Sequence, residues 1–90
     1  MHITIDKSAK DGYWWFLSDD NGTEIYRTAF FPNEKVCALN ALSFQVIIEL
    51  GGKSVTVRKS YDSPGQFVTA SGTLRHDIER ICGKPALGKK

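Results

Sequence analysis

The stretch that decides the fold is YWWFLSDDNGTEIYRTAF, residues 13–30. It places Asn21-Gly22 between two runs rich in aromatic and β-branched residues, which is a strong short-range signal for a β-hairpin. We take Asn21 and Gly22 as the central turn residues. The register that follows pairs Ser18 with Ile25, Phe16 with Arg27 and Trp14 with Ala29.

The two faces of this hairpin differ in composition. The more apolar face is expected to face the core, and it carries Tyr13, Trp15, Leu17, Tyr26, Thr28 and Phe30. Trp14, Phe16 and Arg27 then lie on the face that a single-layer sheet shows to water. Aromatic rings bury a large area at low entropic cost and arginine adds directional donors, so this combination predicts partner-binding residues. The alternative is that the second helix or another strand covers them as a second core layer.

The segments around the hairpin extend the pattern. Residues 3–5 alternate and are β-branched, which predicts a first strand that ends in a polar turn at residues 7–12. Asn33 is a good N-cap, and a helix that begins there has Ala38, Ala41 and Leu42 on one face. Residues 44–50 and 53–59 are expected to form two strands around a Gly51-Gly52 turn, because a longer helix would scatter its polar residues around its circumference.

The C-terminal third repeats this order. Residues 66–70 predict a short strand, and Ser71 to Thr73 offer an N-cap for a helix with Leu74, Ile78 and Ile81 on one face. Gly83 and Pro85 are expected to end that helix. The chain is therefore expected to have an α+β fold of two degenerate β-β-β-α units, with an antiparallel sheet and helices packed on one face.

The first half resembles a known family in four features: Asp11-Gly12, the alternating aromatic strand Tyr13-x-Trp15-x-Leu17, Asn21-Gly22, and a capped helix with the run ALNAL at residues 38–42. This pattern resembles the YegP-like family of small bacterial domains of unknown function, over residues 2–45. The resemblance implies a tandem β-β-β-α repeat and implies no reaction. The second half lacks both the Asn-Gly hairpin and the aromatic strand, and Trp14 stands where family members tend to have a polar or basic residue.

Length and composition limit the class of protein. Ninety residues allow a single domain, expected over residues 1–83 with units at 2–45 and 46–83 and a frayed basic tail at 84–90. A hydrophobic share of 41% with 24% charged residues is ordinary globular composition. No apolar run is long enough for a membrane span and the N-terminus does not look like a signal peptide, so we expect no membrane partner and a cytoplasmic location.

Residues that could carry chemistry are few. Cys37 and Cys82 are expected to be free thiols, and His2 and His76 are too few for a histidine-based metal site or a catalytic triad. The acidic cluster at residues 19–24 is interpreted as a hairpin turn rather than a cation site. Gly51-Gly52-Lys53-Ser54 lacks the first glycine of a phosphate loop. We therefore expect no enzyme, no cofactor and no metal.

The charge distribution suggests a second binding function. Residues 1–50 carry four basic and seven acidic residues, whereas residues 51–90 carry eight basic and three acidic residues. The residues expected to bind phosphate are Arg58 and Lys59, both expected to point outward from a strand, together with Arg75 and Arg80 on a helix. They form one patch if the strand and the helix adjoin. The net charge of +2 is low for a nucleic-acid domain. The other interpretation is a solvated face.

These observations favour a non-catalytic protein-binding module that binds a larger complex. A domain of this size and type fits a phage or mobile-element accessory protein that inhibits a host or defence complex by stoichiometric binding, for example an anti-CRISPR. The alternatives are nucleic-acid binding by the basic half and homo-oligomer formation through a sheet edge or an exposed aromatic face.

Overall fold

The computed structural model describes residues 1–61, 67–68 and 72–82. In chain order its elements are β1 (His2–Ser8), β2 (Gly12–Ser18), β3 (Glu24–Arg27), α1 (Glu34–Leu50), β4 (Thr56–Lys59), β5 (Phe67–Val68) and α2 (Gly72–Cys82). The α+β class is confirmed. The expected tail at 84–90 lies outside the described residues. None of the described helices is long and apolar enough to cross a membrane.

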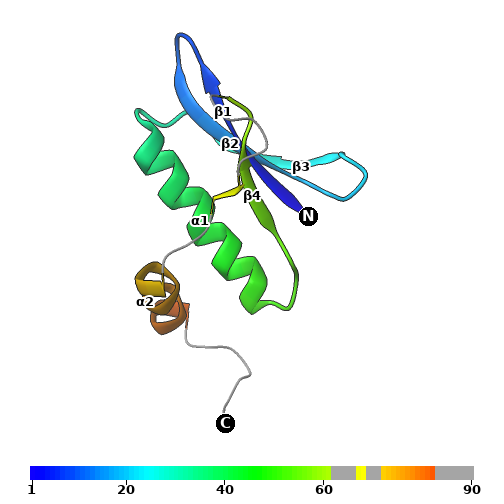
Figure 1. Cartoon of the computed structure of the whole chain (residues 1–90), viewed down its shortest axis with the longest axis vertical. Coiled ribbons are helices and arrows are strands. Elements are labelled where there is room, and N and C mark those ends of the chain that lie inside the picture. The colour runs from blue at the N-terminus through cyan, green and yellow to red at the C-terminus, as the bar shows by residue number, and fades with distance from the viewer. Residues whose placement is uncertain (62–66, 69–71, 83–90) are drawn as a thin grey trace.

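The strands form one mixed sheet in the order β3-β2-β1-β4-β5 (Figure 1). The pairs β3–β2, β2–β1 and β4–β5 are antiparallel, but β1 and β4 are parallel. The expectation of an antiparallel sheet was therefore wrong at this pair. Parallel neighbours require a crossover connection, and α1 provides one between β3 and β4.

Helix α1 begins as the sequence predicts and ends much later. The Oδ1 atom of Asn33 accepts a hydrogen bond from the Val36 amide at 2.9 Å, which confirms the N-cap. The strand expected at residues 44–50 is wrong, because the helix continues to Leu50 and crosses the expected boundary between the two units at 45/46. The Gly51 amide caps it by donating to the carbonyls of Ile47 and Ile48. The relation of the two halves as a repeat stays a prediction.

The polar residues that argued against a long helix all find partners in it. Asn40 accepts from the indole of Trp15, and Ser43 donates to the carbonyl of Leu39, both at 2.8 Å. Gln45 donates to the carbonyl of Val55 and Glu49 accepts from Arg75, both at 2.9 Å. The helix thus presents polar groups to β2, to Val55 just before β4, and to α2. Its polar residues lie all around the helix because it has neighbours on several sides.

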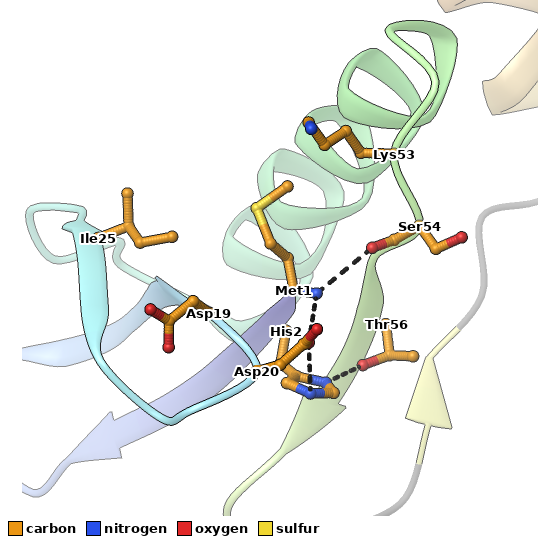
Figure 2. Close-up of a pocket in the computed structure, with 8 residues that line it drawn as sticks. All are labelled: Met1, His2, Asp19, Asp20, Ile25, Lys53, Ser54 and Thr56. Atoms are coloured by element: carbon orange, nitrogen blue, oxygen red, sulfur yellow. Dashed lines mark hydrogen bonds and ion pairs between the residues drawn. The ribbon is translucent and has the colours of Figure 1, made fainter.

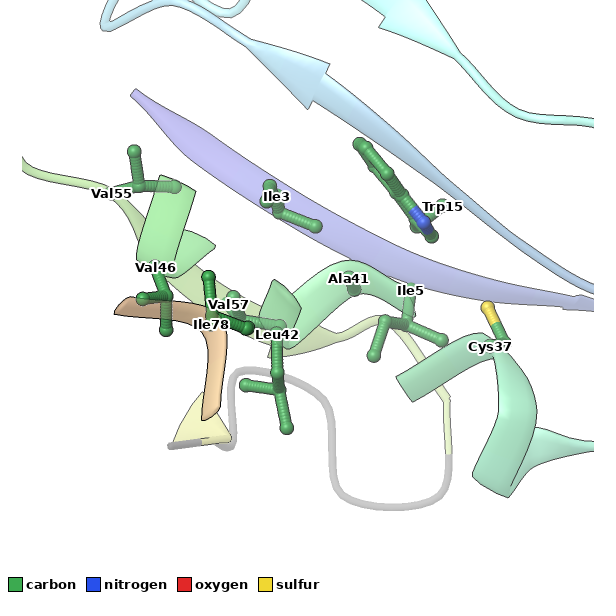
Figure 3. Packing of buried hydrophobic residues seen from close by; sticks show 10 residues of the cluster. All are labelled: Ile3, Ile5, Trp15, Cys37, Ala41, Leu42, Val46, Val55, Val57 and Ile78. Atoms are coloured by element: carbon green, nitrogen blue, oxygen red, sulfur yellow. The ribbon is translucent and has the colours of Figure 1, made fainter. Parts of the chain in front are cut away.

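The core lies between one face of the sheet and α1, with α2 packed against α1 (Figure 3). Strands β1, β2 and β4 contribute Ile3, Ile5, Trp15 and Val57, and α1 contributes Cys37, Ala41, Leu42 and Val46. Ile78 of α2 and Val55 complete the cluster. Trp15 is the largest fully buried side chain, and removing such a side chain typically costs about 3–5 kcal/mol. Ile3 and Ile5, the two large apolar residues of β1, both point to this side of the sheet.

The register of the hairpin formed by β2 and β3 differs from the prediction at both ends. Phe16 pairs with Arg27 as expected, but a bulge pairs Ser18 with Glu24 instead of Ile25. The turn explains this shift, because the Gly22 amide donates to the Asp19 carbonyl at 3.0 Å and Gly22 has φ +85°. The loop is therefore a three-residue turn that ends in a left-handed glycine, and Asn21-Gly22 is not its central pair.

Candidate binding face on the outer side of the sheet

The side of the sheet opposite α1, here called the outer face, follows from strand alternation. Ile3 and Ile5 point to the core, so Thr4 between them points outward. The registers place Arg58, Thr4, Phe16 and Arg27 in one row across β4, β1, β2 and β3. The row combines an aromatic ring with two guanidinium groups from residues distant in sequence.

The predicted partner-binding residues lie together on this face and form the Trp14 cluster: Trp14, Phe16 and Arg27. The rings of Trp14 and Phe16 have centroids 5.3 Å apart, and the Arg27 Cζ lies 4.6 Å from the Trp14 ring centroid. Both aromatic side chains are partly exposed, and the Arg27 side chain is 57% exposed. The cluster therefore lies at the surface with its groups in mutual contact.

Glu24 holds the guanidinium of Arg27 in this position. Its two carboxylate oxygens accept from Arg27 Nη2 at 2.7 Å and from Nε at 3.2 Å. The hydrogen bond and charge of Arg27 lower the pKa of Glu24, and Glu24 in turn raises the pKa of Arg27. An exposed pair of this kind contributes little to folding stability. Its consequence is orientation, because a bidentate pair fixes the plane of the guanidinium beside the Trp14 ring.

Phe30 belongs with this cluster, although the sequence placed it on the core face. Tyr13 bridges to Phe31 rather than to Phe30, so an extra residue sits between the Phe16–Arg27 pair and this bridge. The shift turns Phe30 toward Trp14, with ring centroids 6.4 Å apart, and leaves it 52% exposed. The two adjacent phenylalanines, 30 and 31, were the available signal, since only one could occupy the core side.

A shallow depression continues from Phe16 toward β4. Its lining residues are Thr4, Phe16, Ser18, Gly22, Arg58, Lys59 and Ser60. Arg58 Nε donates to Thr4 Oγ1 at 3.4 Å, and among the described residues no carboxylate forms an ion pair with Arg58. The outer face thus has a carboxylate-bound guanidinium at β3 and a second guanidinium, without such a partner, at β4.

The four residues expected to bind phosphate do not form one patch. Arg58 and Lys59 are neighbours on β4 and point to opposite sides, so the expectation that both point outward was wrong. Lys59 lies 3.8 Å from Glu34 and above the Tyr61 ring. Arg75 pairs with Glu49 at 2.9 Å, and Arg80 pairs with Asp77 at 3.3 Å. Three of the four charges are therefore matched by carboxylates of α1 or α2.

A second depression lies where the first hairpin turn meets the start of β4 (Figure 2). His2 Nδ1 lies 2.7 Å from Thr56 Oγ1, and Asp20 Oδ1 accepts from the Met1 ammonium at 3.0 Å. That ammonium, through its hydrogen bond and charge, lowers the pKa of Asp20. Asp19 accepts from two backbone amides of the turn, those of Asn21 and Thr23, at 2.9 Å each. The Asp19 carboxylate therefore stabilises the turn, as the turn interpretation predicts, whereas the Asp20 carboxylate binds the N-terminal ammonium.

Among the described residues, neither Cys37 nor His76 lines either depression. Cys37 is fully buried in the core, and burial together with the nearby Glu34 charge raises its pKa to about 11. This confirms the interpretation of Cys37 as a small apolar core residue. His76 is exposed on α2. The side chain of Cys82 lies outside the described set.

No protein-family model, curated protein or solved structure matches the chain. The resemblance of residues 2–45 to the YegP-like family stays a prediction.

Proposed function

We propose that the chain is a non-catalytic protein-binding module that binds its partner through the Trp14 cluster. The observation that carries the proposal is the contact between the Arg27 guanidinium and the Trp14 ring at 4.6 Å, on the sheet face opposite α1. Tryptophan and arginine dominate the energetics of many protein interfaces because they combine a large contact area with directional donors. Here the two are already in contact before any partner arrives.

Preorganisation supports this assignment. An exposed arginine normally loses rotamer freedom on binding, at about 0.5–1.5 kcal/mol for each side chain that becomes ordered. Glu24 already holds the Arg27 side chain, and the rings of Phe16 and Phe30 pack beside Trp14. Binding a partner at this cluster therefore costs less side-chain entropy than ordering four independently moving side chains would.

The mode of action that fits such a chain is stoichiometric inhibition or adaptation of a larger complex. Support comes from an aromatic surface on a sheet whose side chains are already in mutual contact. A phage or mobile-element accessory protein, such as an inhibitor of a CRISPR effector, is the biological class that we propose. A cytoplasmic site of action belongs to the same proposal.

Nucleic-acid binding is the second candidate function, and one observation favours it. Arg58 lies in the same row as Phe16 and forms no ion pair with a described carboxylate, so a phosphate could be bound beside an aromatic ring that stacks on a base. The pairing of Lys59, Arg75 and Arg80 with carboxylates weighs against it. Protein binding is therefore the preferred function.

The test is affinity capture from a lysate of the natural host, with nuclease-treated and high-salt arms. Wild-type chain is expected to retain one protein partner in all arms, and Trp14→Ala and Arg27→Ala are expected to lose it while keeping their circular dichroism spectra. Tyr26→Ala is the matched control, because Tyr26 is an exposed aromatic residue on β3 that packs toward Trp15 and Phe44 instead. Capture that disappears with nuclease or salt supports nucleic-acid binding, and capture unchanged by both variants refutes the proposed face.

A further inference from the structure

The depression that runs from Phe16 toward β4 on the outer face holds a guanidinium without an acidic partner, and it is called the Arg58 depression below. Arg58 Nε donates to Thr4 Oγ1 at 3.4 Å, and the two terminal amino groups of Arg58 have no hydrogen-bond partner within the described parts of the chain. The other three arginines are each paired with a carboxylate: Arg27 with Glu24, Arg75 with Glu49 and Arg80 with Asp77. Arg58 is therefore the arginine whose donors are left for a ligand.

The geometry of the Arg58 depression suits a carboxylate. A guanidinium binds a carboxylate through two parallel N–H···O bonds, and the terminal amino groups of Arg58 can supply such a pair of donors. The registers place Arg58 and Phe16 on either side of Thr4, which is only 7% exposed. A carboxylate bound there is therefore held beside an aromatic ring, where partial exclusion of water strengthens a charge-assisted hydrogen bond.

The charges around the depression favour one carboxylate over a chain of phosphates. Asp6 lies on the outer side of β1, where its carboxylate accepts from Ser60 Oγ at 2.8 Å. Toward β3, the Glu24 carboxylate accompanies Arg27. A polyanion that crosses this face therefore meets carboxylates on both sides of the unmatched Arg58 cation, whereas a single carboxylate meets the guanidinium alone.

We propose that the Arg58 depression binds an aspartate or glutamate side chain of the protein partner that covers the Trp14 cluster. This inference rests on the proposed function, because Phe16 belongs to both the cluster and the depression and one partner surface contacts both. The strands of Arg27 and Arg58 are three positions apart in the sheet, or about 14 Å. A partner of standard interface size spans that distance, so its contact surface combines an apolar part over Phe16 with an acidic residue at Arg58.

The first test uses acetate as the probe on the free chain, in an NMR titration at constant ionic strength. The Nε–H signal of Arg58 is expected to shift saturably, and that of Arg27 to stay in place because Glu24 occupies its donors. Arg58→Gln is expected to remove the accompanying shift of the Thr4 backbone amide, and the matched control Arg80→Gln to keep it. A linear or absent shift at Arg58 overturns the site. Single-stranded oligothymidylate is expected to leave the Arg58 signal unchanged, and a shift there overturns the choice of a carboxylate over phosphate.

The second test locates the carboxylate in the captured complex. Arg58→Lys places a primary amine in the depression, and a water-soluble carbodiimide joins such an amine to a carboxylate in contact with it, forming an amide and releasing the urea of the reagent. Mass spectrometry is expected to find position 58 linked to one aspartate or glutamate of the partner. Lys35, exposed on α1 on the other side of the sheet, is the internal control and is expected to form no link to the partner. A complex that forms normally without a link from position 58 overturns the proposal.

Affinity for the captured partner separates this inference from the function on which it rests. Arg58→Gln is expected to weaken binding about fivefold, as for loss of one partly exposed ion pair, with Arg80→Gln unchanged. Arg58→Lys keeps the charge and is expected to bind more tightly than Arg58→Gln, which excludes a general loss of folding as the cause. Wild-type affinity in Arg58→Gln together with lost capture in Trp14→Ala overturns the acidic contact and leaves the proposed function standing. Unchanged capture in both variants overturns both.

Discussion

Asn40→Ala is expected to destabilise the fold, because the buried indole of Trp15 loses its hydrogen bond to this helix residue. Trp15 is fully buried, and its indole N–H donates to Asn40 Oδ1 at 2.8 Å. Alanine at position 40 leaves this donor without its partner inside the core. The same contact joins β2 to α1, so the substitution tests the link between the sheet and the extended helix.

The magnitude follows from two opposing effects. A buried donor left without a partner costs about 1–3 kcal/mol, and replacing asparagine by alanine within a helix returns up to about 0.7 kcal/mol. With the full helix gain, the expected net loss of unfolding free energy is about 0.3–2.3 kcal/mol. For a domain of this size, about 1 kcal/mol corresponds to a drop of roughly 4–8 °C in Tm.

The assay is urea unfolding of four proteins: wild type, Asn40→Ala, Trp15→Phe and the double variant. Phenylalanine has no N–H group, so Asn40→Ala in the Trp15→Phe background should be neutral or slightly stabilising. Ser43→Ala is the matched control, since Ser43 donates only to the Leu39 carbonyl of its own exposed helix side. An equal cost of Asn40→Ala in both backgrounds would refute the assigned hydrogen bond as the cause.

Two further changes test the turn geometry and the buried thiol. Gly12 has φ +105°, and an added Cβ would overlap the Phe31 carbonyl oxygen, whereas Gly22 has φ +85° and open space around it. The left-handed conformation alone costs about 1–2 kcal/mol and the overlap adds to it at Gly12, so Gly12→Ala should lower the free energy of unfolding in urea by more than Gly22→Ala does. Equal losses would contradict the overlap. Burial raises the pKa of Cys37 from 9.0 to about 11, so the unfolded chain releases its proton first and stability should fall as pH rises from 9 toward 11. Cys37→Ala should remove that component of the pH dependence, and an unchanged slope would contradict it.

Helix capping and strand pairing near the hairpin could be predicted from local sequence patterns. The N-cap at Asn33 and the pairing of Phe16 with Arg27 were predicted and are confirmed. The register failed two residues away because Gly22 ends a three-residue turn, a choice that depends on how Asp19 bonds the loop amides. An Asn-Gly pair is compatible with both turns, so the residues alone did not decide between them.

The end of α1 was the larger error. Residues 44–50 alternate in hydropathy, and the polar residues of the segment looked misplaced in a helix. Their partners are distant in sequence: Gln45 bonds the Val55 carbonyl, and Glu49 bonds Arg75. Such contacts exist only after the chain has folded, so helical periodicity could not reveal them. The same limit applies to Lys59, whose inward side depends on β4 pairing parallel with β1.

The candidate binding face could be predicted in part. Strand alternation brought Trp14, Phe16 and Arg27 to one side, and the structure places them in contact there. Phe30 was missed as a member of this face, and Arg58 was expected to point outward but not to lie in one row with Phe16 and Arg27. Phe30 depends on an irregularity in the β2–β3 pairing, and Arg58 depends on a strand order that places β4 beside β1.

The central claim is that a protein partner covers the outer face at the Trp14 cluster. Hydroxyl-radical footprinting of the captured complex against the free chain measures this directly, because oxidation of exposed aromatic rings falls when a partner covers them. The account predicts that Trp14, Phe16 and Phe30 become protected while Tyr26, an exposed aromatic residue on the other side of β3, keeps its rate. Protection of Tyr26 with no change at Trp14 would contradict it.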